Sequence, residues 1–78
     1  MDNVKIGKML EKYRKEKGIS QAEIAKKAGM SQQQISQYEK GTREPKIENI
    51  SKIFKALGIS ATISIGSKSN GEIIWQLD

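Results

Sequence analysis

The sequence predicts a mainly α-helical fold, a bundle of about four helices, followed by a C-terminal β-hairpin. Up to about residue 60, apolar residues recur three and four positions apart, as on the buried face of an amphipathic helix. Serines and glycines stand where such helices would begin and end. After residue 60, apolar and polar residues alternate, as in a half-buried strand. We therefore expect a helical domain at 1–60 and a hairpin extension at 61–78.

A first helix is expected over residues 4–17. Asp2 or Asn3 can cap its start, because their short side chains accept hydrogen bonds from free backbone N–H groups. Gly18 suits the left-handed position that follows a helix. The apolar residues of this segment share one face: Ile6, Leu10 and Tyr13.

Two short helices with the same starting signal are expected next. Ser20 with Glu23, and Ser31 with Gln34, have the spacing of a capping box, in which two side chains satisfy each other's free backbone N–H groups. The second helix should run to about residue 28 and the third to about residue 40. Each is followed by a glycine that can make a sharp turn, Gly29 and Gly41. Two capped helices thus flank one glycine turn.

A loop over residues 42–45 separates the third helix from a fourth, which should end at Gly58. Lys46, at its start, is a poor N-cap because a lysine side chain cannot accept a hydrogen bond. The helix is predicted from its apolar spacing: Ile47, Ile50, Ile53, Phe54 and Leu57.

The final segment is predicted to be a hairpin with Asn70 and Gly71 in its turn. A two-residue turn would pair Ile65 with Gln76 and divide the apolar residues between both faces, so a loop of about three to five residues is preferred. That register brings the apolar side chains together: Ile63, Ile65, Ile73, Trp75 and Leu77. An isolated hairpin is marginally stable, so this set either packs on its own helices or joins a second subunit. A sheet shared between two subunits is the preferred interpretation. If the strand edge and the tryptophan stayed exposed, they would favour uncontrolled association, and pairing with a second subunit covers them.

Composition narrows the classes of function. The formal net charge is +5, and residues 1–60 hold 13 basic and 7 acidic residues, so the basic excess lies in the helical domain. Such a surface favours polyanions, although many proteins carry only a solvated lysine-rich exterior. The chain has no histidine and no cysteine, which excludes disulfides and the usual zinc ligands. We expect no catalytic constellation, no cofactor, no small-molecule ligand, no membrane segment and a cytoplasmic location.

The third predicted helix has two different faces. Ile35 and Tyr38 point to one side, and the opposite stripe carries amides, a hydroxyl and one amine: Gln33, Ser36, Gln37 and Lys40. Such a stripe suits the major groove of DNA, where glutamine can form two hydrogen bonds with adenine. The alternative is a solvated face that happens to be rich in glutamine. Solvated surface helices more often carry pairs of glutamate and lysine than a run of glutamines, so the DNA-binding interpretation of this face is preferred.

These residues carry a family resemblance. The run from Ile19 to Ser31, the Glu39-Lys40-Gly41 segment and the Arg43-Glu44-Pro45 segment resemble the helix-turn-helix of phage repressors and Cro proteins, also called XRE-like regulators. The resemblance extends from about Ile6 to Ile59. It implies a lambda-repressor-like helix-turn-helix bundle that binds double-stranded DNA and regulates transcription.

The resemblance also implies roles for individual side chains. Base edges should be read from the third helix and its start by Gln32, Gln33, Ser36 and Gln37. The DNA backbone should be contacted by Gln21, Ser31, Lys40, Thr42 and Arg43. Arg14 and Glu39 fall where the family often has a buried ion pair, the alternative being ordinary surface charge.

Two functions from different classes remain open at this point. The first is a repressor that binds a palindromic operator as a homodimer and needs no effector. The second is an antitoxin that binds a toxin protein and regulates its own operon. Many family members continue into a fifth helix that helps dimerisation, whereas this sequence turns to strand periodicity at residue 61, so the hairpin is the expected dimerisation element.

Overall fold

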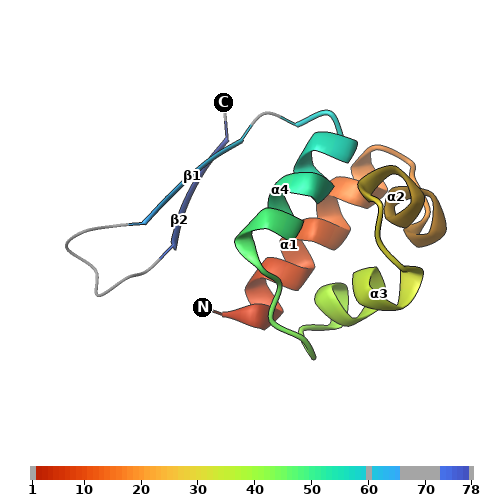
Figure 1. Cartoon of the computed structure of the whole chain (residues 1–78), viewed down its shortest axis with the longest axis horizontal. Helices are drawn as coiled ribbons and strands as arrows, with labels where there is room; N and C mark the ends of the chain where they lie inside the picture. Colours follow the sequence, from red (N-terminus) through yellow and green to blue (C-terminus); the bar gives the residue numbers. More distant parts are fainter. Residues whose placement is uncertain (1, 60, 66–72, 78) are drawn as a thin grey trace.

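The computed structural model describes residues 2–59 in full and residues 61–65 and 73–77 by their backbone. Its elements follow the predicted order (Figure 1). The four helices are α1 (Asn3–Glu16), α2 (Gln21–Ala28), α3 (Gln32–Lys40) and α4 (Ile47–Ala56). The two strands are β1 (Ala61–Ile65) and β2 (Ile73–Leu77). The fold is therefore mainly helical, with four helices in the expected places.

The helix ends are largely fixed by local hydrogen bonds. At the start of α1, Oδ1 of Asp2 accepts from the backbone N–H groups of Val4 and Lys5, each at 3.1 Å. Before α2, the Ser20 hydroxyl accepts from the Glu23 N–H at 3.1 Å. The reciprocal half of that predicted box does not form, because the Glu23 carboxylate turns toward Lys27, 3.5 Å away on the next turn.

At the start of α3 the predicted capping box is complete. The Ser31 hydroxyl accepts from the Gln34 N–H at 3.1 Å, and Oε1 of Gln34 accepts from the Ser31 N–H at 3.1 Å. Lys46 stands before α4 without a side-chain cap, in agreement with its chemistry. Three of the four helices therefore begin at a side-chain acceptor.

The core lies where the four helices meet. Helix α1 packs against α3, and α2 packs against both α3 and α4. Tyr13 and Phe54 add an edge-to-face aromatic contact between α1 and α4, with ring centroids 6.2 Å apart. The buried apolar side chains come from every helix and from the end of α4: Ile6, Leu10, Ile24, Ala25, Ala28, Ile35, Tyr38, Ile50, Ile53, Phe54 and Leu57.

Helices α1 and α3 approach each other closely at Gly7. A β-carbon at this position would lie 2.7 Å from the main-chain oxygen of Glu39 and closer still to that of Tyr38. No side chain fits in that space. Gly7 is thus a packing position, whereas the glycines that end the helices, such as Gly29 and Gly41, have positive φ.

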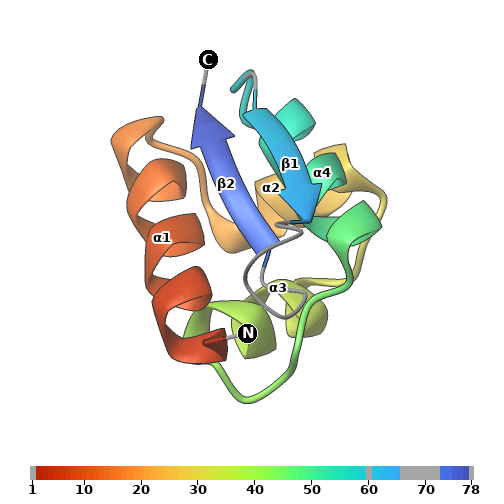
Figure 2. The same ribbon diagram turned by 90° about the vertical axis from the view of Figure 1, so that its left-hand side faces the viewer.

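The strands β1 and β2 pair antiparallel, with Ile63 opposite Trp75 and Ile65 opposite Ile73. The connection at 66–72 and the side chains of both strands lie outside the described residues, so the expected clustering of Ile63, Ile65, Ile73, Trp75 and Leu77 stays a prediction. The strands lie beside α1 and α4, on the opposite side of the bundle from α2 and α3 (Figure 2). Among the described residues, no helix is both long and apolar enough to cross a membrane.

Candidate nucleic-acid interface

Helices α2 and α3 are joined by a tight three-residue turn, Gly29-Met30-Ser31. Gly29 adopts φ of +69°, and the Met30 N–H donates to the Ala25 carbonyl at 2.8 Å. This bond from beyond the glycine back into the helix is the Schellman arrangement, which reverses the chain. Ala25 and Ala28, in the second half of α2, are both buried.

Helix α3 has the two faces that the sequence predicted. Ile35 and Tyr38 are each 2% exposed and point into the core. On the opposite side, Gln33 and Lys40 are exposed, while Ser36 and Gln37 are half-buried. Gln32 is also exposed, at the first position of the helix. The side chains expected to read base edges therefore lie together on one open face.

The loop after α3 folds back onto the carbonyl group of Gln37. Gly41 adopts φ of +76°, and its own N–H donates to the Tyr38 carbonyl at 3.1 Å. The N–H and the hydroxyl of Thr42 then both donate to the Gln37 main-chain oxygen, at 3.1 and 3.3 Å. This anchor brings Arg43 alongside α3, where its Nη1 donates to the Gln37 side-chain oxygen at 3.2 Å.

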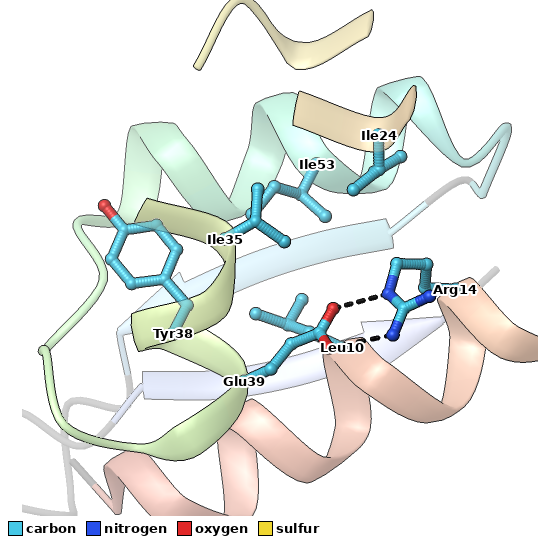
Figure 3. Close-up of a pocket in the computed structure, with 7 residues that line it drawn as sticks. All are labelled: Leu10, Arg14, Ile24, Ile35, Tyr38, Glu39 and Ile53. Atoms are coloured by element: carbon cyan, nitrogen blue, oxygen red, sulfur yellow. Dashed lines mark hydrogen bonds and ion pairs between the residues drawn. The ribbon is translucent and has the colours of Figure 1, made fainter. Parts of the chain in front are cut away.

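Beneath this face lies the ion pair of Arg14 and Glu39 (Figure 3). Nε of Arg14 is 2.6 Å from Oε2 of Glu39, and Nη2 is 3.0 Å from Oε1. The side chains are 11% and 3% exposed. The hydrogen bond to Glu39 raises the pKa of the Arg14 guanidinium, although burial opposes the shift. The guanidinium also donates to the Ile19 carbonyl at 2.8 Å, so it holds the segment between α1 and α2.

Sequence reasoning missed one member of this cluster. The Gln21 side-chain amide donates to Oε1 of Glu39 at 3.0 Å, so the residue expected at a DNA phosphate is held by the buried carboxylate. One N–H of that amide and its oxygen remain for another partner. Ser31 likewise has a second role, as the cap of α3. The structure places both residues at helix N-termini, where the helix dipole favours anions.

A further hydrogen bond ties α3 to α4, and a buried proline lies in the loop between them. Nδ2 of Asn49 donates to the Tyr38 hydroxyl at 2.9 Å, which satisfies a polar group in the core. Pro45 is fully buried and closes the loop between the two helices. The trailing proline was visible in the sequence motif, but nothing local to Asn49 signalled its partner, which lies 11 residues away.

The interior offers little room for a ligand. A cavity of about 10 Å³, the space that one water molecule requires, lies among the four helices. Figure 3 shows its lining: Leu10, Arg14, Ile24, Ile35, Tyr38, Glu39 and Ile53. In the described part of the chain, no group of three or more potential metal ligands comes together.

Known proteins share this arrangement. Residues 10–63 match a family described as helix-turn-helix. The HTH-type transcriptional regulator SinR of Bacillus licheniformis is 35% identical over 74 residues, which cover 94% of this chain and 67% of SinR. The structure of the restriction-modification controller protein C.AhdI from Aeromonas hydrophila superposes with a TM-score of 0.74 at 36% identity, over 76% of this chain and 86% of the controller. The clp gene regulator ClgR from C. glutamicum gives 0.72 at 28% identity, over 74% and 75%.

Proposed function

Because the chain belongs to the XRE-type helix-turn-helix family of DNA-binding transcriptional regulators, we propose that it is a sequence-specific repressor that binds a palindromic operator as a homodimer. One observation carries this proposal: the open face of α3 displays amides and a hydroxyl, while the inner face of the same helix is locked into the core. Amide side chains carry a donor and an acceptor on one rigid group, which matches the edges of base pairs in the major groove.

The residues divide into two roles in this proposal. Base edges are contacted from α3 by Gln32, Gln33, Ser36 and Gln37. The sugar-phosphate backbone is contacted around both ends of α3 and at the start of α2, by Gln21, Ser31, Lys40, Thr42 and Arg43. Backbone contacts set the register of the helix in the groove, and base contacts supply the sequence preference. The hydrogen bond from Gln21 to Glu39 supports this division, because it couples a phosphate contact to the helix that reads the bases.

A single α3 helix reads only a few base pairs, so a repressor of this size needs two copies. A two-fold axis would place the α3 helices about 34 Å apart, one turn of DNA, and would require a near-palindromic operator. The hairpin is our candidate for the dimer contact, because a two-stranded sheet leaves a free edge on each strand. Its position supports this assignment, since it lies away from α2 and α3 and leaves their outer face open (Figure 1).

Selection from a pool of random duplexes tests the proposal directly. The full chain should enrich a near-palindrome with half-sites one helical turn apart, and its affinity should fall steeply as salt rises. Enrichment of no site over bulk DNA at moderate salt would contradict the proposal. Co-purification of a small partner protein that displaces DNA would instead favour the antitoxin function.

A further inference from the structure

From the loop after α3 we infer that Arg43 sets the base preference of Gln37 and is not only a contact to the DNA backbone. The inference rests on the proposed function and assigns a positioning role within the same interface. It begins from the three hydrogen bonds, given above, that Thr42 and Arg43 make with Gln37. Those to the Gln37 main chain fix the course of the loop, and the bond from Arg43 fixes the side chain.

The chemistry of arginine decides which end of the Gln37 amide faces it. A guanidinium carries only donors, so the atom 3.2 Å from Nη1 of Arg43 must be the amide oxygen. The two ends of a planar amide point in different directions, so the NH₂ group of Gln37 is turned away from Arg43. Among the described residues no acceptor binds this NH₂ group, and it is free to donate to DNA.

An oriented glutamine reads bases differently from a free one. Reading adenine requires both ends of the amide, because the oxygen accepts from N6 and the NH₂ group donates to N7. With its oxygen held by a cation, Gln37 presents mainly donors. Guanine offers two acceptors in the major groove, O6 and N7, whereas adenine sets a donor beside its single acceptor. Gln37 should therefore prefer guanine.

Gln33 provides an internal comparison on the same stripe. Its side chain is exposed and forms no hydrogen bond within the described part of the chain, so both ends of its amide remain available. We expect Gln33 to read adenine and Gln37 to read guanine, although the two residue types are identical. Arg43 keeps further N–H donors for a phosphate, so one side chain joins the DNA backbone to the base-reading residue.

The test is selection of DNA sites by the full chain and by three variants: Gln37→Ala, Arg43→Ala and Lys40→Ala. Loss of preference in Gln37→Ala identifies the base pair that Gln37 reads. At that base pair the unmodified protein should favour guanine, and Arg43→Ala should shift the ratio of guanine to adenine by about tenfold toward adenine. Lys40→Ala, the matched control, removes another basic side chain at the end of α3 and should weaken binding without changing any base preference.

Two results overturn the inference while leaving the proposed function in place. One is a preference for adenine at the Gln37 position in the unmodified protein. The other is an Arg43→Ala variant that binds more weakly but keeps every base preference. Failure of the proposed function looks different, since no site is then enriched. In that case the inference can still be tested without DNA, by nuclear magnetic resonance of the side-chain amides. Arg43→Ala should shift the amide signals of Gln37 and leave those of Gln33 in place. Unchanged Gln37 signals would overturn the inference.

Discussion

Arg14 binds both carboxylate oxygens of Glu39, at 2.6 and 3.0 Å, and thereby joins α1 to α3. Glu39 is 3% exposed and also accepts a hydrogen bond from Gln21 at 3.0 Å. One buried carboxylate thus connects α1, α2 and α3. Arginine suits this place because its planar fork matches a carboxylate and leaves a further N–H for the Ile19 carbonyl.

Replacement of Glu39 by alanine should lower the free energy of unfolding by about 3 to 5 kcal/mol, because it leaves the guanidinium of Arg14, whose side chain is only 11% exposed, without its counter-ion. Glu11→Ala is the matched control. Glu11 pairs with Lys15 at 3.5 Å on the surface of α1, and its loss should cost about 0 to 1 kcal/mol. Urea unfolding measures both. Equal midpoints for the two variants would show that the buried pair contributes no more than a surface one.

The same pair predicts a weak dependence of stability on pH near neutrality. The folded state raises the pKa of Arg14, so the stabilisation is fully present below the unfolded pKa and is lost only as pH rises through the still higher folded value. That window lies in strongly alkaline solution. The difference in stability between the unmodified protein and Glu39→Ala should stay constant from neutral to moderately alkaline pH. A loss of the difference in that range, measured by urea unfolding, would contradict the assignment.

Gln33→Ala and Lys40→Ala should separate reading from positioning. The first should cost about 1 to 3 kcal/mol at the preferred site and relax the preference at one base pair. The second should weaken binding to all duplexes alike and reduce the slope of affinity against salt by about one unit. Titrations on specific and non-specific duplexes measure both effects. The assigned roles are wrong if both variants lose the same affinity on both duplexes.

Deletion of residues 61–78 should leave a folded helical domain that sediments as a monomer and binds a half-site weakly. Among the residues whose side chains the structure describes, the four helices and the end of α4 build a core of their own. Circular dichroism checks the fold, and sedimentation checks the assembly. A truncated protein that remains dimeric at micromolar concentration would remove the hairpin from the dimer contact, as would a full chain that is monomeric on its operator.

Gly7→Ala should destabilise the protein by about 1 to 3 kcal/mol, because the added methyl group meets the main chain of α3 rather than a flexible side chain. Lys8→Ala, at the adjacent exposed position of α1, is the control and should change stability by no more than about 0.5 kcal/mol. Thermal unfolding compares the two. A Gly7 variant as stable as the Lys8 variant would mean that α1 can move away from α3 at little cost.

The sequence predicted those features that depend on neighbouring residues. The Ser31 and Gln34 box and the turn at Gly29 span three or four positions, so their geometry follows from local spacing. Glu23 is an exception, because Lys27 at the next turn competes for its carboxylate. The position of Arg14 opposite Glu39 was suggested only by the family resemblance.

Contacts between distant segments could not be predicted in this way. The need for glycine at residue 7 depends on where α3 passes, and that is decided by the whole core. The bond from Asn49 to Tyr38 and the bond from Gln21 to Glu39 also require the assembled helices. The contact of Arg43 with Gln37 depends on a reversal of the chain after α3, whose course the glycine alone did not specify.

In α3 the residues that anchor the helix in the core are separate from those that point outward. This separation affects how readily the protein could come to bind a different DNA sequence. The groups that anchor the helix are Ile35, Tyr38 and Glu39, and none of them lies on the stripe that faces outward. Replacing the outward side chains as a set should therefore change the preferred DNA sequence and leave the free energy of unfolding nearly unchanged. Gln37 and Arg43 would have to be exchanged together, because the Arg43 guanidinium holds the Gln37 amide in one orientation.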